Sequence, residues 1–91
     1  MSVVIHFVPT SMTVEQYDEA RRRLDEAGYW PPEGMDYHVC FGAGDKMRVS
    51  EIWDSQEQLA AFGERLMPVL ADIGIETGEP EVVEVHAIVK R

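Results

Sequence analysis

The sequence predicts an α+β fold whose strands and helices follow in the order β-α-β-β-α-β. Four short runs support this because they are rich in β-branched and aromatic residues and alternate in polarity, as strands do. Two longer segments repeat apolar residues at helical spacing and begin with capping signals. With 91 residues, 45% of them hydrophobic, the chain is expected to form one domain, residues 1–91.

The first half of the chain predicts a strand, a helix and a second strand. Residues 2–8 (SVVIHFV) are a β-branched run. Thr13 and Gln16 have the spacing of a capping box, which opens a helix, and Gly28 is the residue type that ends one. After a proline-containing loop, residues 37–41 (YHVCF) predict the second strand.

The second half predicts a hairpin, a helix and a last strand. Residues 42–45 (GAGD) suit a hairpin turn, from which residues 47–53 (MRVSEIW) return as the third strand. Ser55 repeats the capping logic at the start of a second helix, which Gly74 ends. Residues 82–89 (VVEVHAIV) alternate in polarity and predict the fourth strand.

This order is the ferredoxin-like βαββαβ motif, a four-stranded antiparallel sheet with both helices on one face. Alternate side chains of a strand point to opposite faces, and the more apolar set of each strand is expected under the helices: Val3, Ile5, Phe7, Tyr37, Val39, Phe41, Val83, Val85, Ala87 and Val89. The other set carries all three histidines and is expected on the open face, the one without helices: Val4, His6, Val8, His38, Cys40, Val82, Glu84, His86 and Ile88.

An open face of this composition predicts association. It is too apolar to leave in water and too polar for a dry core, and a chain this short buries little surface by itself. We therefore expect a homodimer in which a second copy covers the open face around a partly wet cavity.

Charge and cysteine content exclude several classes of function. A net charge of −9 disfavours binding to nucleic acid. The single cysteine cannot form an internal disulfide, and no segment has the pattern of a signal peptide or a membrane span. A cytoplasmic protein with neither nucleic acid nor membrane as partner is expected.

The segment Glu51 to Phe62 (EIWDSQEQLAAF) resembles the antibiotic biosynthesis monooxygenase (ABM) type domain of the dimeric α/β-barrel superfamily, in which a Glu-x-Trp strand end runs into a Ser-x-Glu-capped helix. The resemblance implies two sheets that close into a barrel across a dimer, with a ligand cavity. The superfamily includes cofactor-independent monooxygenases, haem-degrading enzymes, lactone isomerases and proteins of no known activity. Residues 56–73 contain no histidine, which disfavours haem, and no cofactor is expected.

The catalytic candidates are His6, His86 and Glu84. His6 and His86 lie on strands that are neighbours in this motif, so they could form a proton-transfer pair, and a buried Glu84 could act as a base. The alternative is that each histidine fills space and makes local hydrogen bonds.

The ligand-binding candidates are Trp53, His38, Cys40 and Glu51. Trp53 could stack on an aromatic ligand beside Glu51, although it could equally anchor its strand to the second helix. Cys40 is read as a small hydrophobic residue, not a nucleophile. No metal site is predicted, because strands two and four are opposite edges and lie roughly 14 Å apart in one chain.

The function these features favour is binding of a small hydrophobic or aromatic molecule in a dimeric α/β barrel. The reaction expected is cofactor-independent oxygenation or isomerisation of an aromatic or polyketide-type compound. The alternative is a non-catalytic ligand-binding or stress-responsive-type barrel, whose lumen would be filled by side chains.

Overall fold

The computed structural model describes residues 1–90, so Arg91, the last residue of the predicted domain, lies outside the described range. The six elements follow in the predicted order. They are β1 (Val3–Phe7), α1 (Val14–Glu26), β2 (Met35–Phe41), β3 (Arg48–Trp53), α2 (Gln56–Ile73) and β4 (Glu81–Glu84).

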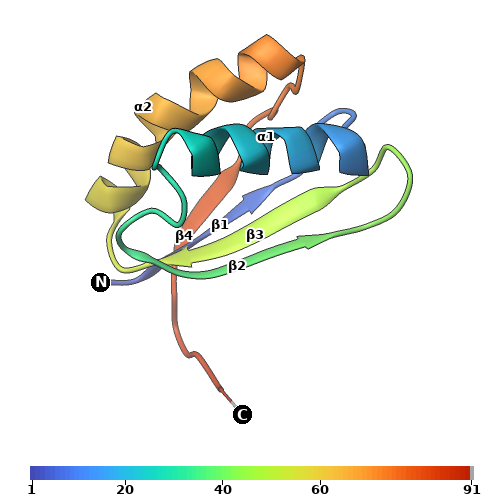
Figure 1. The fold of residues 1–91 in the computed structure, drawn as a ribbon. Coiled ribbons are helices and arrows are strands. Elements are labelled where there is room, and N and C mark those ends of the chain that lie inside the picture. Colours follow the sequence, from blue (N-terminus) through green and yellow to red (C-terminus); the bar gives the residue numbers. More distant parts are fainter. Residues whose placement is uncertain (91) are drawn as a thin grey trace.

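The strands form one antiparallel sheet in the order β2-β3-β1-β4, and both helices cover the same face of it (Figure 1). This confirms the ferredoxin-like fold. The core lies between the sheet and the helices, where Trp53 is completely buried and Ile5, Leu24 and Phe62 are nearly so. Removal of these side chains from water is the main stabilising contribution.

The predicted helix ends are confirmed. Thr13 accepts a hydrogen bond from the backbone N–H of Gln16, whose side chain accepts one from the backbone N–H of Thr13. Ser55 caps α2 by accepting from the backbone N–H of Gln58. Gly74 ends that helix at a φ of 89°, a left-handed conformation that favours glycine.

The predicted faces of β2 are wrong. Directly paired residues of antiparallel strands share a face, and His38 pairs with Glu51 while Cys40 pairs with Val49, both under the helices. The cause is a register irregularity between Met35 and Tyr37, which shifts the alternation by one residue. Three apolar residues of β2 consequently lie on the open face: Tyr37, Val39 and Phe41.

The fourth strand is shorter than predicted and its faces are also exchanged. Val82 pairs with Ile5 and Glu84 with Val3, so both lie on the helix side, whereas Val83 pairs with Val4 on the open face. The strand ends at Glu84 because β1, its only neighbour, starts opposite it at Val3. Residues 85–90 then leave the sheet toward the open side (Figure 1).

The three histidines therefore do not share one sheet face. His6 lies on the open face, opposite Ser50. His38 lies under the helices, and His86 is exposed beyond the end of β4.

Candidate functional site

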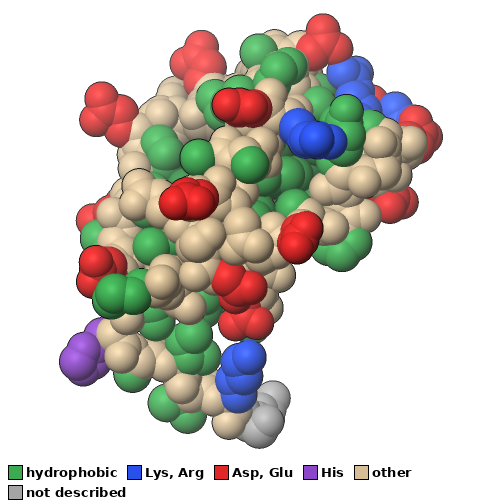
Figure 2. Space-filling model, turned by 90° about the vertical axis from the view of Figure 1, so that its left-hand side faces the viewer, with side chains coloured by type: hydrophobic (Ala, Val, Ile, Leu, Met, Phe, Trp, Pro, Cys, Tyr) green, Lys and Arg blue, Asp and Glu red, His purple; other side chains and the backbone are tan. Residues whose placement is uncertain are grey.

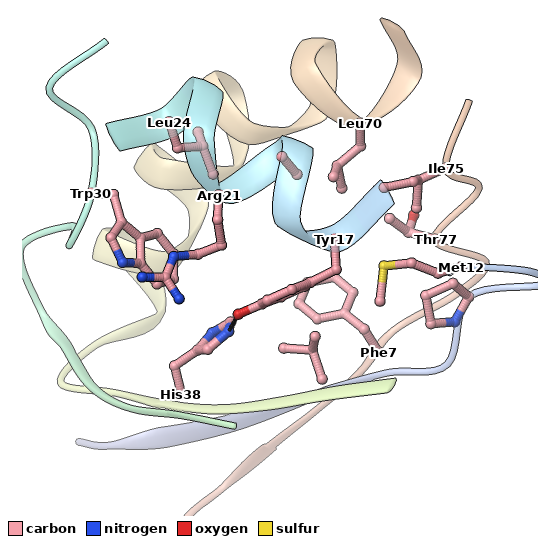
Figure 3. Close-up of a pocket in the computed structure, with 13 residues that line it drawn as sticks. Phe7, Met12, Tyr17, Arg21, Leu24, Trp30, His38, Leu70, Ile75 and Thr77 are labelled. Carbon is pink, nitrogen blue, oxygen red and sulfur yellow. Dashed lines mark hydrogen bonds between the residues drawn. The ribbon is translucent and has the colours of Figure 1, made fainter. Parts of the chain in front are cut away.

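A chain of hydrogen bonds centred on His38 lies between α1 and the sheet. The His38 Nδ1 is 2.6 Å from Glu51 Oε2, and its Nε2 is 2.6 Å from the Tyr17 hydroxyl oxygen, toward which it points in Figure 3. Trp53 donates from its indole N–H to the other carboxylate oxygen of Glu51, at 3.0 Å. Four side chains from three elements thus form one continuous polar network.

The chemistry of the partners sets the direction of each bond. An ionised carboxylate only accepts, so Nδ1 of His38 carries the proton that Glu51 accepts. In the neutral imidazole, Nε2 then has a free lone pair and accepts from the Tyr17 hydroxyl. The arrangement is a phenol, an imidazole and a carboxylate in series, which is a relay able to move a proton.

Local structure brings these side chains together. Tyr17 lies one turn into α1, on the side of the helix that faces the sheet. Glu51 and Trp53 are two residues apart in β3 and so share a face. The irregularity in β2 turns His38 to that same face, opposite Glu51. Glu51 is only 3% exposed, and its two hydrogen bonds offset the cost of burying a charge there.

An apolar pocket of about 60 Å³ adjoins this network (Figure 3). It lies between α1 and the sheet, and its wall includes Tyr17, His38, Trp30, Arg21, Phe7 and Met12. The volume corresponds to roughly two water molecules in the liquid, while pockets for drug-sized ligands are about 300 to 1,000 Å³. A larger aromatic molecule would have to displace side chains of this wall in order to enter.

Burial controls the ionisation of two groups near the pocket. It raises the pKa of the Tyr17 phenol, an effect that the neighbouring Arg21 opposes. It also raises the pKa of the Cys40 thiol. Both groups therefore carry their protons at neutral pH, and the phenol is available as a donor to His38.

The predicted ligand-binding residues converge. His38, Glu51 and Trp53 are joined by hydrogen bonds, and Cys40 lies two residues after His38 on the same face of β2. Trp53 also packs against Phe62 of α2, with ring centroids 5.6 Å apart, which is the contact that an anchoring role requires.

The predicted catalytic residues do not converge with that group. His6 pairs through Nδ1 with the Ser50 hydroxyl at 2.8 Å on the open face. Glu84 is exposed at the edge of the sheet, and His86 is exposed beyond it. Their catalytic roles stay predictions.

Three residues of the site were not predicted: Tyr17, Arg21 and Trp30. Tyr17 occupies an apolar position of the helix repeat, and the signal for its role is that a buried tyrosine hydroxyl normally has a hydrogen-bond partner. Trp30 lies in the loop before β2, and its ring meets His38 edge-on at a centroid distance of 5.0 Å. Arg21 follows Tyr17 by four residues, which places both on one side of α1.

Within residues 1–90, no group of three or more histidine, cysteine or acidic side chains is placed to hold a metal ion. Over the same range, neither helix is both long enough and apolar enough to span a membrane. Acidic side chains are spread across the surface seen in Figure 2, with hydrophobic ones between them.

Comparison with protein families finds no family model that matches the chain. No curated protein matches it either. What the chain is similar to therefore rests on comparison of structures alone.

Solved structures do match, with the ABM type among them. SnoaB from Streptomyces nogalater, described as a cofactor-independent oxygenase, superposes with a TM-score of 0.62 at 12% identity, covering 99% of this chain and 96% of that one. A candidate antibiotic biosynthesis monooxygenase from Deinococcus radiodurans gives 0.61 at 11% identity, covering 100% and 98%. The structural-genomics protein YjcS gives 0.67 at 14% identity, covering 94% and 100%. Identities this low establish a shared fold and leave the activity open.

Proposed function

We propose, from the ABM-type fold of this chain, that it binds a small aromatic or polyketide-type molecule in the pocket beside His38. The reaction proposed is removal of a proton from an acidic C–H or O–H group of that molecule. Both oxygenation by dioxygen and isomerisation without a cofactor can begin with this step. The observation that carries the proposal is the series Tyr17, His38 and Glu51, which ends in an apolar pocket.

The relay would act as a general base. A substrate proton passes to the Tyr17 oxygen while the Tyr17 proton moves to Nε2 of His38. The imidazolium that forms is stabilised by the Glu51 carboxylate, which Trp53 holds in place. The substrate anion left in the pocket would then react with dioxygen, or regain a proton at another carbon.

A homodimer is part of this proposal. Several large apolar side chains are exposed on or near the open face, among them Tyr37, Val83, Ile88 and Val89. Of these, Tyr37, Ile88 and Val89 border a hollow of about 580 Å³ that Glu84 and His86 also line. A second copy seated here would exclude water from this surface. A site built from His6, His86 and Glu84 would need such an assembly and is the competing location for the chemistry, which the experiment below distinguishes from the site at His38. The free cysteine, Cys40, suits the cytoplasmic location proposed.

The alternative is a non-catalytic barrel. The small volume of the pocket, about 60 Å³, favours it, because a pocket this small leaves little free space for a ligand. The two functions differ in one respect: only the catalytic one needs His38 as a base.

The three histidines allow a matched experiment. Oxygen uptake would be measured with anthrone, a polyketide-like probe whose ring CH₂ is acidic. Conversion of that CH₂ to a carbonyl takes one atom of dioxygen and releases the other as water. We expect His38→Gln to lower the rate by at least about a hundredfold, the usual contribution of a general base, and His6→Gln and His86→Gln to leave it nearly unchanged.

The opposite pattern, loss with His6→Gln or His86→Gln but not with His38→Gln, would move the site to the open face. If the wild-type protein consumed no oxygen and did not bind anthrone, the non-catalytic alternative would be preferred.

A further inference from the structure

Arg21 differs from the arginines that follow it in α1. Arg22 binds the carboxylates of Glu19 and Glu26, and Arg23 binds Glu19 and Asp72. Among residues 1–90, Arg21 has no carboxylate within ion-pair distance. Over that range its charge has no acidic partner, although the chain carries a net charge of −9.

The guanidinium of Arg21 is held at the pocket. It lies over the ring of Trp30, 4.6 Å from the centroid, and both side chains line the pocket (Figure 3). A cation above an aromatic face is attracted by the ring electrons. The position of the charge is thus set by the protein before any ligand arrives, which lowers the cost of binding one.

The groups around Arg21 suit one kind of ligand. The pocket beside it is apolar, and no acidic side chain is among the residues that line it. Glu51, which lies behind His38, is already engaged by His38 and Trp53. A flat ring would need less displacement of the wall than a bulkier group would. A guanidinium offers two parallel N–H donors that match the two oxygens of a carboxylate. Repulsion from acidic residues farther away than about 8 Å is screened at physiological salt. Asp18 and Asp25 lie one turn from Arg21 along α1, but neither is within ion-pair distance of it. Arg21 is the one lysine or arginine among the residues that line the pocket.

We propose that Arg21 determines the specificity of this pocket by binding the carboxylate of a planar aromatic acid, whose ring enters the apolar space beside Trp30 and His38. This rests on the proposed function, because it assigns the ligand class of the same pocket.

The test compares two probes of nearly equal shape, benzoate and benzamide, which differ in charge. Binding to the full chain would be followed by NMR through the indole N–H of Trp30. We expect wild-type protein to bind benzoate at least about tenfold more tightly than benzamide. Arg21→Gln should abolish that preference, and Arg21→Lys should keep only part of it, because the ammonium lacks the planar fork.

Arg65→Gln is the matched control. Arg65 lies over the ring of Tyr29, 4.5 Å from its centroid, but it does not line the pocket. Arg65 belongs to α2, and its partner Tyr29 is the residue before Trp30. The variant therefore removes the same charge and the same type of contact outside the pocket, so the preference for benzoate should persist.

Four results would overturn the proposal. Equal binding of the two probes by wild-type protein would refute the role of Arg21 and leave the proposed pocket intact. A preference that survives Arg21→Gln, or that is lost in Arg65→Gln, would place the anion elsewhere. If neither probe bound, the pocket itself would be refuted, and with it the proposed function.

Discussion

Glu51 is the one charged residue classed as buried within residues 1–90. Its carboxylate presents two oxygens to two N–H donors, one from His38 and one from Trp53. Each donor and each oxygen is thereby satisfied, which is the condition under which a buried charge is tolerated. The same contacts hold the imidazole of His38 in the tautomer that can accept a proton from Tyr17.

Glu51→Gln should destabilise the protein and change this tautomer. A glutamine has one acceptor, so either an N–H donor faces another donor, or the His38 proton moves to Nε2. We expect a loss of about 1 to 3 kcal/mol in the free energy of unfolding, measured by urea denaturation, and a change in the ¹⁵N shifts of His38. Glu57→Gln, at an exposed position of α2, is the control; equal losses in both variants would contradict the argument.

At the scale of elements, α1 carries both the relay phenol and the pocket cation, so its stability matters to the site. Its exposed side is held by Glu19, which binds Arg22 and Arg23, and Arg23 in turn reaches Asp72 of α2. These two arginines lower the pKa of Glu19 to about 2. Exposed ion pairs are weak singly, but this cluster links the two helices.

Glu19 should therefore contribute a pH-dependent part of the stability. A carboxyl whose pKa is lowered in the folded state stabilises that state above its ordinary pKa of 4.5, and the contribution is lost as pH falls from there toward about 2. We expect Glu19→Gln to melt at a lower temperature than wild type at pH 6, and the gap to narrow below pH 4.5 and nearly close at about pH 2.

Circular dichroism across this pH range would measure the gap, and added salt should also reduce it. Glu15→Gln, at an exposed position in the same helix, should show no such dependence. A gap that stays constant from pH 6 to pH 2 would contradict a role for the Glu19 charge.

At the scale of the whole molecule, apolar surface is unevenly distributed. The helices cover one face of the sheet, while the other face carries exposed apolar side chains, including Val83 at 48% and Tyr37 at 57% exposure. Exposed apolar patches of this kind commonly mark an interface. The open face is therefore where we expect a second copy of the chain.

Val83→Asp should weaken the dimer by at least about tenfold, because a carboxylate on each copy would have to leave water at the contact. Val14→Asp is a closely matched control, since Val14 is 45% exposed but lies in the first turn of α1, on the covered side of the sheet. Analytical ultracentrifugation over a range of concentrations would measure both. A wild-type protein that is monomeric at micromolar concentration, or equal effects of the two variants, would refute this interface.

The sequence by itself determined the elements, their order and the ends of both helices. Periodicity and caps such as Thr13 and Ser55 are local features, and local interactions produce them in the same way in any context. The order of elements then predicted the ferredoxin-like arrangement, in which both helices pack on one face of the sheet. The grouping of His38, Glu51 and Trp53 as ligand-binding candidates also came from the sequence.

Only the tertiary structure decided which side chains of β2 and β4 face the helices, and where β4 ends. The irregularity between Met35 and Tyr37 reverses the faces of β2, and the start of β1 at Val3 limits β4. Both depend on pairing with another strand, so no pattern within β2 or β4 alone records them. A polar residue such as His38 was predicted to face outward, but partners 13 and 21 residues away in sequence, Glu51 and Tyr17, make its burial favourable.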